Sequence, residues 1–405
     1  MEWFITLRNI AFLFATLMLI KYFVFLVIAP FYTVKEKIRF ERIKRRMSVP
    51  YKPLVSIVIP AWNEEIGIKK SILSLVTNTY KKIEIIVIND GSTDRTEEAV
   101  KSIKDRRLRY FKKENGGKGT ALNLGVNKAK GEIIVTMDAD SAFDKQAIEN
   151  LIKYFRDDSI MAVVGNVKIA GGKGLIAYIQ KLEYKFGFYF KRAHAVMGAE
   201  YIFGGACSAF RREVFEKLGG FDIDNKTEDI EISMRMRFNG MKCTFASDVI
   251  CYTEGASSIM GLANQRLRWK KGRFDTFIKY RRLFMSLDRR HNKFLSWFVL
   301  PYALLSELQL LFEPIALTLL LAYSFISGDY LSLAIGSLFI MIIYFVESFW
   351  VDGIKPWFWL TFFFTWPLFY FLVWIEYLAL IKGFFMILRG DDIKWQRWNR
   401  VGVSI

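Results

Sequence analysis

The sequence predicts an α/β domain with a mostly parallel central sheet, flanked by transmembrane and interfacial helices. β-branched strand patterns alternate with helical patterns between residues 54 and 155. Strands that are apolar throughout are typical of a parallel sheet with helices on both faces. Long apolar runs at 4–30 and at about 297–388 are each long enough to cross a bilayer.

We expect an N-terminal transmembrane anchor at 1–34, a cytoplasmic domain at 35–290, and C-terminal interfacial and transmembrane helices with a basic tail at 291–405. Residues 4–30 of this anchor contain only Arg8 and Lys21 as charges, and they lack the small-residue cleavage site of a signal peptide. The basic run "KEKIRFERIKRR" that follows is typical of the cytoplasmic side. The expected location is therefore the plasma membrane, with several spans.

The net charge of +18 indicates a negatively charged partner. Positive-inside bias and attraction to anionic lipid explain it better than nucleic-acid binding, for which no motif is present. We therefore expect a lipid bilayer as a partner and no nucleic acid. The three cysteines form no CxxC pair and there are only two histidines, so neither a zinc site nor a disulfide framework is predicted.

Four strand–helix units follow one another in the predicted domain. "LVSIVIPAWNEE" at 54–65 predicts a strand and then a helix from Glu64, and "IEIIVINDGSTDRTEEAV" at 83–100 predicts a second pair with its helix beginning near Arg95. "RLRYFKKENGGKGTALNLGVNKA" and "GEIIVTMDADSAFDKQAIENLIKYF" repeat the pattern. Parallel sheets bind ligands beyond the carboxyl ends of their strands. The polar residues at those ends are Glu64, Asp90, Lys118, Asp138 and Asp140.

Two of these segments favour a metal-bound diphosphate. "MDAD" places Asp138 and Asp140 on the same side of an extended backbone, and such hard oxygen ligands suit Mg²⁺ or Mn²⁺ with a diphosphate completing the shell. "NGGKGTALN" combines glycines, Lys118 and a helix N-terminus, which together favour phosphate, although a plain loop is an equal alternative. It does not match the P-loop spacing, so ATP hydrolysis is not expected.

The triplet "TED" at 227–229 begins a predicted helix that ends at Gly240, with Thr227 as its expected cap. Acids are common in a first helical turn, where the helix dipole stabilises them. The alternative is that Asp229 is a carboxylate held ionised by the helix end, as the general base for a sugar hydroxyl must be. The triplet alone leaves both interpretations open.

The pentapeptide "QRLRW" lies in a predicted helix from 257 to about 282. On a helix, Gln265, Arg268 and Trp269 share one face, and the two residues after Gln265 point elsewhere. A guanidinium suits a diphosphate, an indole suits the apolar face of a sugar ring, and an amide suits hydroxyls. This face therefore suits a sugar nucleotide.

The ordered signatures "NDGSTD", "DAD", "TED" and "QRLRW" resemble the family 2 glycosyltransferases, in particular the processive membrane synthases of cellulose, chitin, hyaluronan and poly-N-acetylglucosamine. The resemblance runs from about Val55 to Trp269. It implies a GT-A-type nucleotide-sugar-binding domain and a metal-dependent, processive, inverting transferase. This enzyme would polymerise a UDP-sugar donor, with UDP-N-acetylglucosamine favoured, onto a growing β-linked polysaccharide acceptor and help to translocate it.

The same resemblance implies roles for individual residues. Asp229 would be the general base, and Asp140 would bind the divalent cation. Cys207 would lie near the acceptor pocket, although a buried thiol without a role is an equal alternative. The implied substrate-binding residues, from the uridine to the acceptor sugar, are Pro60 and Glu64 with the turn between them, Asp90, Asp138, Lys118, Glu228, Cys207, Gln265, Arg268 and Trp269.

The segment after Trp269 is more basic than the poly-N-acetylglucosamine branch leads us to expect. We hypothesise that residues 270–276 form a mobile lid that closes over UDP. Lys271 and Arg273 would then bind the diphosphate.

The C-terminal part predicts spans at about 303–326 and 331–350, and a longer stretch at 357–388 that Pro367 interrupts. Carboxylates in such segments are costly unless they face protein or water. They can line a polymer path or reach the headgroups from helix ends. A path built from so few spans would need a small membrane subunit or a homo-oligomer. The acids concerned are Glu307, Glu313, Glu347 and Glu376.

Two other functions fit parts of the pattern. A non-processive membrane transferase that makes a glycolipid or a polyprenyl-linked sugar would share "NDGSTD" and "DAD", but it would not need the "QRLRW" platform. A transporter or sensor that binds nucleotide sugars without chemistry would not need Asp229.

Overall fold

The computed structural model describes residues 20, 22–46, 51–171, 174–349 and 362–389. Most of the expected anchor and the whole basic tail after Arg389 lie outside the described residues. The first helix that is described in full is α2 (Phe31–Arg46), which carries the basic run after the anchor.

The four predicted strand–helix units are present. Strands β1 to β4 are all parallel and stand in the order β3-β2-β1-β4. The strands are β1 (Val55–Ala61), β2 (Ile83–Asp90), β3 (Leu108–Lys113) and β4 (Ile133–Thr136), and the helices that follow them are α3 (Ile68–Val76), α4 (Thr96–Lys101), α5 (Lys118–Lys128) and α6 (Ala147–Tyr154).

The sheet continues beyond these units to eight strands, in the order β3-β2-β1-β4-β7-β6-β8-β5. Strand β7 (Ser208–Arg211) is antiparallel to both of its neighbours, β4 and β6 (Ile160–Ile169). Strand β8 (Lys242–Thr253) runs parallel to β6, and β5 (Ser141–Phe143) pairs antiparallel with β8. The predicted GT-A-like α/β fold is confirmed, with a mixed, mostly parallel sheet.

Helices cover both faces of the sheet because successive strand side chains point to opposite sides. In β1, Ile57 and Ile59 pack with α3 and α6 on one face. Val58 packs on the other face with α5, α8 (Arg212–Leu218) and α9 (Glu228–Phe238). Both layers are buried, so the carboxyl ends of β1, β2 and β4 are held rigidly.

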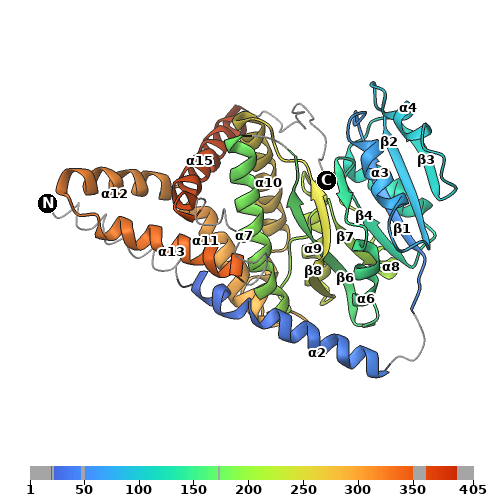
Figure 1. Ribbon diagram of the computed structural model, residues 1–405, viewed down its shortest axis with the longest axis horizontal. Helices are drawn as coiled ribbons and strands as arrows, with labels where there is room; N and C mark the ends of the chain where they lie inside the picture. Colours follow the sequence, from blue (N-terminus) through green and yellow to red (C-terminus); the bar gives the residue numbers. More distant parts are fainter. Residues whose placement is uncertain (1–19, 21, 47–50, 172–173, 350–361, 390–405) are drawn as a thin grey trace.

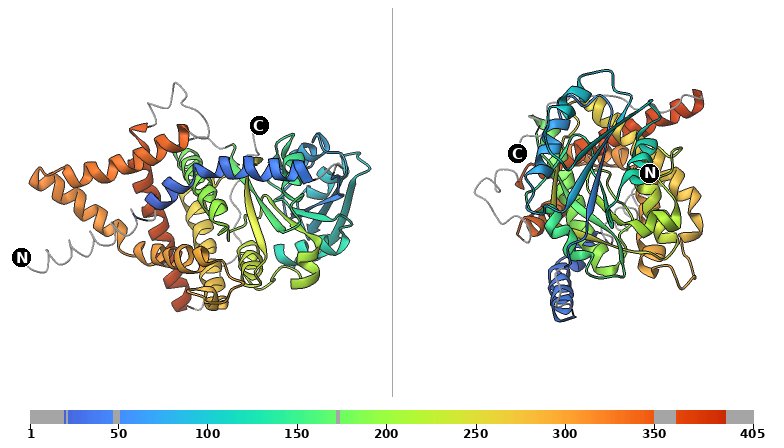
Figure 2. Two further views of the ribbon diagram at one scale, coloured as in Figure 1. Left: turned by 90° about the horizontal axis from the view of Figure 1, so that it is seen from below. Right: turned by 90° about the vertical axis from the view of Figure 1, so that its right-hand side faces the viewer.

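The other helices form a second layer and an apolar extension. Helices α7 and α10 lie between the sheet and the apolar helices α11 to α13, which extend away from it (Figures 1 and 2). The segments concerned are α7 (Leu175–Met197), α10 (Ile259–Lys279), the turns η1 (Arg281–Leu283) and η2 (Leu295–Val299), α11 (Leu300–Gln309), α12 (Glu313–Ser327), α13 (Leu331–Glu347) and α15 (Thr365–Arg389).

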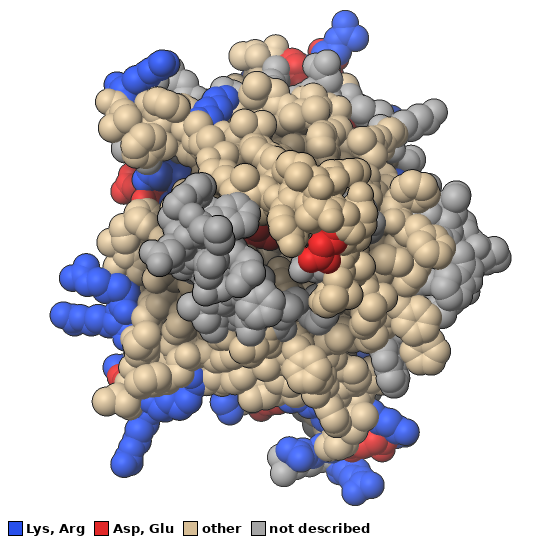
Figure 3. Space-filling model, turned by 90° about the vertical axis from the view of Figure 1, so that its left-hand side faces the viewer, with Lys and Arg blue, Asp and Glu red and all other residues tan. Residues whose placement is uncertain are grey.

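Among the described residues, one helical segment, Pro367–Met386, is long and apolar enough to cross a membrane. The pair Leu295–Gln309 and Glu313–Ser327 qualifies only jointly, with a bend of 59°. The expected span at 303–326 is therefore not one straight helix, because the helix breaks before Pro314, which has no backbone N–H to donate. That this bent pair crosses the membrane stays a prediction. The end of the molecule at α12 and α13 has few charges at its centre and Lys and Arg at its rim (Figure 3).

Two described helices lie in the other two stretches that were expected to span the membrane. Helix α13 ends at Glu347 within the stretch 331–350, and α15 begins at Thr365 within the stretch 357–388. Residues 350–361 lie outside the described part of the chain.

Candidate active site

The loop after β1 is joined to the loop after β2. Pro60 lies inside β1 opposite Ile88, so the expectation that it belongs to the turn is wrong. Asn63 adopts a left-handed backbone conformation with φ 57°, and its Oδ1 accepts the N–H of Thr93 at 2.7 Å. The N–H of Glu64 donates to the Thr96 hydroxyl at 2.8 Å. These bonds occupy the backbone at Glu64, and α3 begins at Ile68, four residues later than expected.

Asp90 organises the glycine loop that precedes α5. The carboxylate is only 3% exposed, and it accepts the N–H of Gly116 at 3.1 Å and that of Gly117 at 2.8 Å. Lys113 Nζ lies 2.6 Å from it. Gly117 has φ 88°, a conformation that favours glycine. Asp90 therefore fixes the loop that delivers Lys118, and its expected contact with uridine stays a prediction.

Lys118 joins three elements at the centre of the site. Its Nζ lies 2.7 Å from Asp138 Oδ1, just after β4, and 3.1 Å from Glu228 Oε1, at the start of α9. Burial opposes the charge of Lys118, but Asp138 and Glu228 outweigh burial and raise the pKa of the ammonium. A Cβ at Gly205 would lie 2.5 Å from Lys118 Nζ, so only glycine leaves room for the lysine there.

Asp229 lies beside this ion pair. Its Oδ2 accepts the N–H of Gly205 at 2.8 Å, and its Oδ1 accepts the N–H of the next residue at 2.9 Å. Burial and the charge of Glu228 raise the pKa of Asp229 to about 6, although Lys118 and Arg268 favour the charged form. The helix end was expected to hold this carboxylate ionised. Burial and the charge of Glu228 instead move the pKa of Asp229 above that of an ordinary aspartate.

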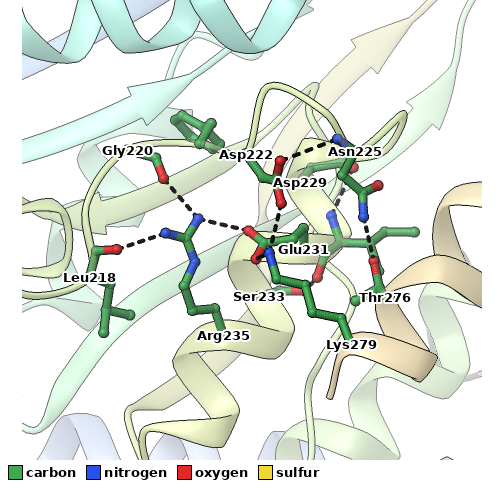
Figure 4. Close-up of polar contacts among 12 residues, drawn as sticks. Leu218, Gly220, Asp222, Asn225, Asp229, Glu231, Ser233, Arg235, Thr276 and Lys279 are labelled. Atoms are coloured by element: carbon green, nitrogen blue, oxygen red, sulfur yellow. Dashed lines mark hydrogen bonds and ion pairs between the residues drawn. The ribbon is translucent and has the colours of Figure 1, made fainter. Parts of the chain in front are cut away.

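The helix that carries Asp229 packs very closely on α10. We expected Thr227 to cap α9, but its side chain makes no capping hydrogen bond. Its hydroxyl donates to Asn225 Oδ1 at 3.1 Å instead. A Cβ at Gly272 in α10 would lie 2.1 Å from Thr227 Oγ1. Asn225 also donates to Thr276 Oγ1 at 3.0 Å (Figure 4). The start of α9 therefore rests directly on the backbone of α10.

Glu231 fixes the register of the same two helices one turn later. It is fully buried and accepts hydrogen bonds from Lys279 Nζ at 2.7 Å and from Tyr280 Oη at 2.6 Å. It also pairs with Arg235 at 2.7 Å, and Lys279 reaches Asp222 at 2.7 Å (Figure 4). A buried carboxylate needs such partners. We did not predict Gly272, Asn225 or Glu231, although a glycine within a helix can signal a close approach.

Gly272→Ala is expected to lower both the melting temperature and the rate of sugar transfer, because the new methyl group overlaps the Thr227 hydroxyl. Overpacking of this kind costs about 1–3 kcal/mol. The matched control is Gly187→Ala in α7, where a Cβ meets nothing within 4 Å. Thermal unfolding and UDP release measure both variants. Equal behaviour of the two would show that the contact between α9 and α10 does not position the site.

The "QRLRW" segment lies within α10, so the predicted helix is confirmed. Arg268 interacts electrostatically with Glu228 and Asp229. Burial lowers the pKa of its guanidinium, and these two carboxylates oppose that shift. We expected Arg266 to point away from the face that carries Trp269, and this expectation is wrong. Its guanidinium carbon lies 4.3 Å from the centroid of the Trp269 ring.

Buried charges connect the same helix to α7, α11 and α15. Arg266 pairs with Glu183 of α7. Lys270 Nζ lies 2.9 Å from Glu307 and 3.0 Å from Glu376. Glu307 and Glu376, which the sequence places in apolar segments, therefore face protein.

The proposed lid at 270–276 is wrong as a separate moving segment, because these residues lie in the middle of α10. Arg273 is bound to Glu307 at 2.6 Å, and Lys271 to Asp275 at 2.6 Å. Both side chains therefore already have carboxylate partners within the helical layer.

Cys207 lies in the core of the domain, whereas Asp140 lies at the edge of the sheet beside Asp138. Cys207 is 2% exposed in the core beside Cys251, which favours the alternative of a buried thiol without a role. Its expected place near the acceptor pocket stays a prediction. Asp140 Oδ1 lies 3.3 Å from Ser141 Oγ and 3.4 Å from Thr253 Oγ1, at the edge where Asp138 also lies. In the described part of the chain, no group of three or more His, Cys, Asp or Glu residues could hold a metal. A cation bound here would need ligands from a substrate.

Comparisons with known proteins place part of the chain in a family. Residues 56–219 match the glycosyl transferase family 2 model. The poly-β-1,6-N-acetyl-D-glucosamine synthases of Staphylococcus aureus (strain COL) and Staphylococcus epidermidis are 30% and 29% identical over 230 residues, which are 56% of this chain and 56% of theirs. The chain thus matches about half the length of these relatives.

Among solved structures, a mannosyltransferase from Pyrobaculum calidifontis in complex with GDP-Man and Mn²⁺ has a TM-score of 0.55 and 23% identity. The match covers 89% of this chain and 99% of that one, and it supports the fold. The segment 56–219 therefore matches glycosyl transferase family 2, and the chain has a GT-A-like fold.

Proposed function

We propose that this protein is a processive, inverting membrane glycosyltransferase that polymerises a UDP-sugar into a β-linked polysaccharide. The observation that carries the proposal is the single cluster formed by Asp229, Lys118, Asp138 and Arg268, which combines a proton acceptor with cations for a diphosphate. The similarity to poly-β-1,6-N-acetyl-D-glucosamine synthases supports UDP-N-acetylglucosamine as the donor.

The residues act by direct displacement. The acceptor hydroxyl attacks the anomeric carbon as the bond to UDP breaks, and Asp229 takes the proton of that hydroxyl. Lys118 and Arg268 stabilise the negative charge that develops on the diphosphate. Attack from the opposite side converts an α-linked donor into a β-linked product. The hydrogen bond from Gly205 keeps Asp229 in place throughout.

A divalent cation is part of the proposal. Asp140, with Asp138 beside it, would hold Mg²⁺ or Mn²⁺, since carboxylate oxygens suit both ions and the diphosphate can complete the shell. When bound, the ion neutralises charge on the diphosphate. The pairing of Asp138 with Lys118 keeps the two kinds of phosphate partner side by side.

The acceptor and the membrane complete the proposal. Gln265, Arg268 and Trp269 would bind the growing polysaccharide, and the domain at 35–290 would face the cytoplasm. The apolar helices would sit in the plasma membrane as part of a multi-pass region. A small membrane subunit or a second copy of the chain would complete a path for the polymer.

A non-processive transferase that makes a glycolipid or a polyprenyl-linked sugar is the second candidate. It would use the same donor site, with Lys118 beside Asp138, without the platform formed by Gln265, Arg268 and Trp269.

One experiment tests both candidates. The purified protein is incubated with a panel of UDP-sugars and Mg²⁺, Mn²⁺ or a chelator, and UDP release and product mass are measured. Long products from UDP-N-acetylglucosamine support the proposal, and addition of single sugars supports the second candidate. Sugar-nucleotide binding without UDP release would contradict both.

The transfer rate is expected to fall as the pH drops below about 6, by about tenfold per pH unit, because Asp229 must be ionised to accept a proton. Burial and Glu228 hold the pKa of Asp229 at about 6, so Glu228→Gln should move the acid limb of the kcat profile to lower pH. A profile that Glu228→Gln does not move would show that another group controls the rate.

A further inference from the structure

A cavity with several charged residues in its wall lies away from the active site. It has a volume of about 220 Å³ and is enclosed by α7, by strands β6 and β8, and by the end of α13. None of the residues that we assign to the sugar nucleotide or the acceptor lines it. The charged residues of its wall are Lys168, Lys181, Lys185, Arg192 and Glu347.

The charges of the wall favour an anion. Four cations face one carboxylate, Glu347, and that carboxylate is bound to Lys185 at 2.8 Å. Lys185 Nζ also donates to Ser348 Oγ at 2.9 Å. Lysine and arginine side chains of this kind are partners for phosphate.

A buried hydroxyl provides a second, independent observation. Tyr189 lines the cavity and is 2% exposed, and its Oη has no hydrogen-bond partner among the described residues. Burying a hydroxyl without a partner is costly. A phosphate oxygen in the cavity would accept this hydrogen bond.

The position of the cavity indicates where the phosphate comes from. Tyr344 and Glu347 of α13 form one wall, and Ile342 and Phe345 of the same helix are exposed apolar side chains. The cavity thus lies between strands β6 and β8 of the sheet and the apolar helix α13, at the level of lipid headgroups if that helix enters a bilayer. We propose that it binds the phosphodiester headgroup of an anionic phospholipid.

The test measures lipid retention by native mass spectrometry of the full-length protein extracted from nanodiscs of phosphatidylcholine with or without phosphatidylglycerol. The wild type is expected to retain phosphatidylglycerol in preference to phosphatidylcholine. Lys181→Gln should reduce retention about fivefold, because a lysine near an anionic surface contributes about that factor. Tyr189→Phe should also reduce it, since it removes only the hydroxyl.

Two controls make the result specific. Lys44→Gln in α2 removes the same charge from an exposed position outside the cavity and should leave retention unchanged. Melting temperatures show whether each variant is folded. Equal retention of both lipids, or equal losses in Lys44→Gln and Lys181→Gln, would overturn the proposal. Displacement of the lipid by millimolar glycerol phosphate, with the same response to Lys181→Gln, would assign the cavity to soluble phosphates instead. Because retention is measured without a sugar nucleotide, failure here is distinct from failure of the proposed transferase activity.

Discussion

Asp229→Asn is expected to lower sugar transfer by at least about a hundredfold, the usual contribution of a general base, while UDP binding changes little. The asparagine amide has the shape of the carboxylate, and its oxygen can still accept the N–H of Gly205. It cannot take a proton from the acceptor hydroxyl. UDP release under turnover and equilibrium binding of UDP are therefore expected to separate in this variant.

Asp224→Asn is the matched control for this prediction. Asp224 is exposed in the loop before α9, so the variant removes one negative charge from the same region without touching the cluster. It should transfer sugar at the wild-type rate. Substantial synthesis by Asp229→Asn would refute the role of the carboxylate, and loss of UDP binding would indicate a damaged site rather than a missing base.

Local patterns were sufficient to predict the first half of the sheet. Strands β1, β2 and β4 are mostly apolar, with Ser56 and Glu84 as interior exceptions, so their burial on both faces and their parallel pairing could be predicted from the sequence. The second half could not be predicted in this way. Strand β7 inserts between β4 and β6 in antiparallel orientation, and that depends on pairing between segments far apart in the chain.

The candidate site shows the same division. The convergence of Lys118 and Asp138 followed from strand ends that meet at one edge of the sheet. The raised pKa of Asp229 was missed because it depends on burial and on the position of Glu228. The contact of Gly272 with Thr227 was missed because it depends on which helices pack together.

Trp269→Ala is expected to reduce polymer synthesis by at least about tenfold, as truncation of a buried aromatic anchor commonly does, with a much smaller effect on UDP binding. Arg266 packs against the indole and is itself held by buried Glu183, so the structure fixes the ring from one side. In the proposed function its other contacts are with the acceptor sugar, and the loss should therefore appear in product length and acceptor use.

Two further variants separate this role from ordinary packing. Trp269→Phe keeps an aromatic ring for the sugar and for Arg266, and it should retain more synthesis than Trp269→Ala. Trp297→Ala removes a tryptophan that is 51% exposed and lies outside the cluster, so it should leave transfer unchanged. Trp269→Ala could instead lose UDP binding and polymer synthesis to the same extent. The donor site would then have moved together with the acceptor site, and the main role of the indole would be to hold α10 against its neighbours.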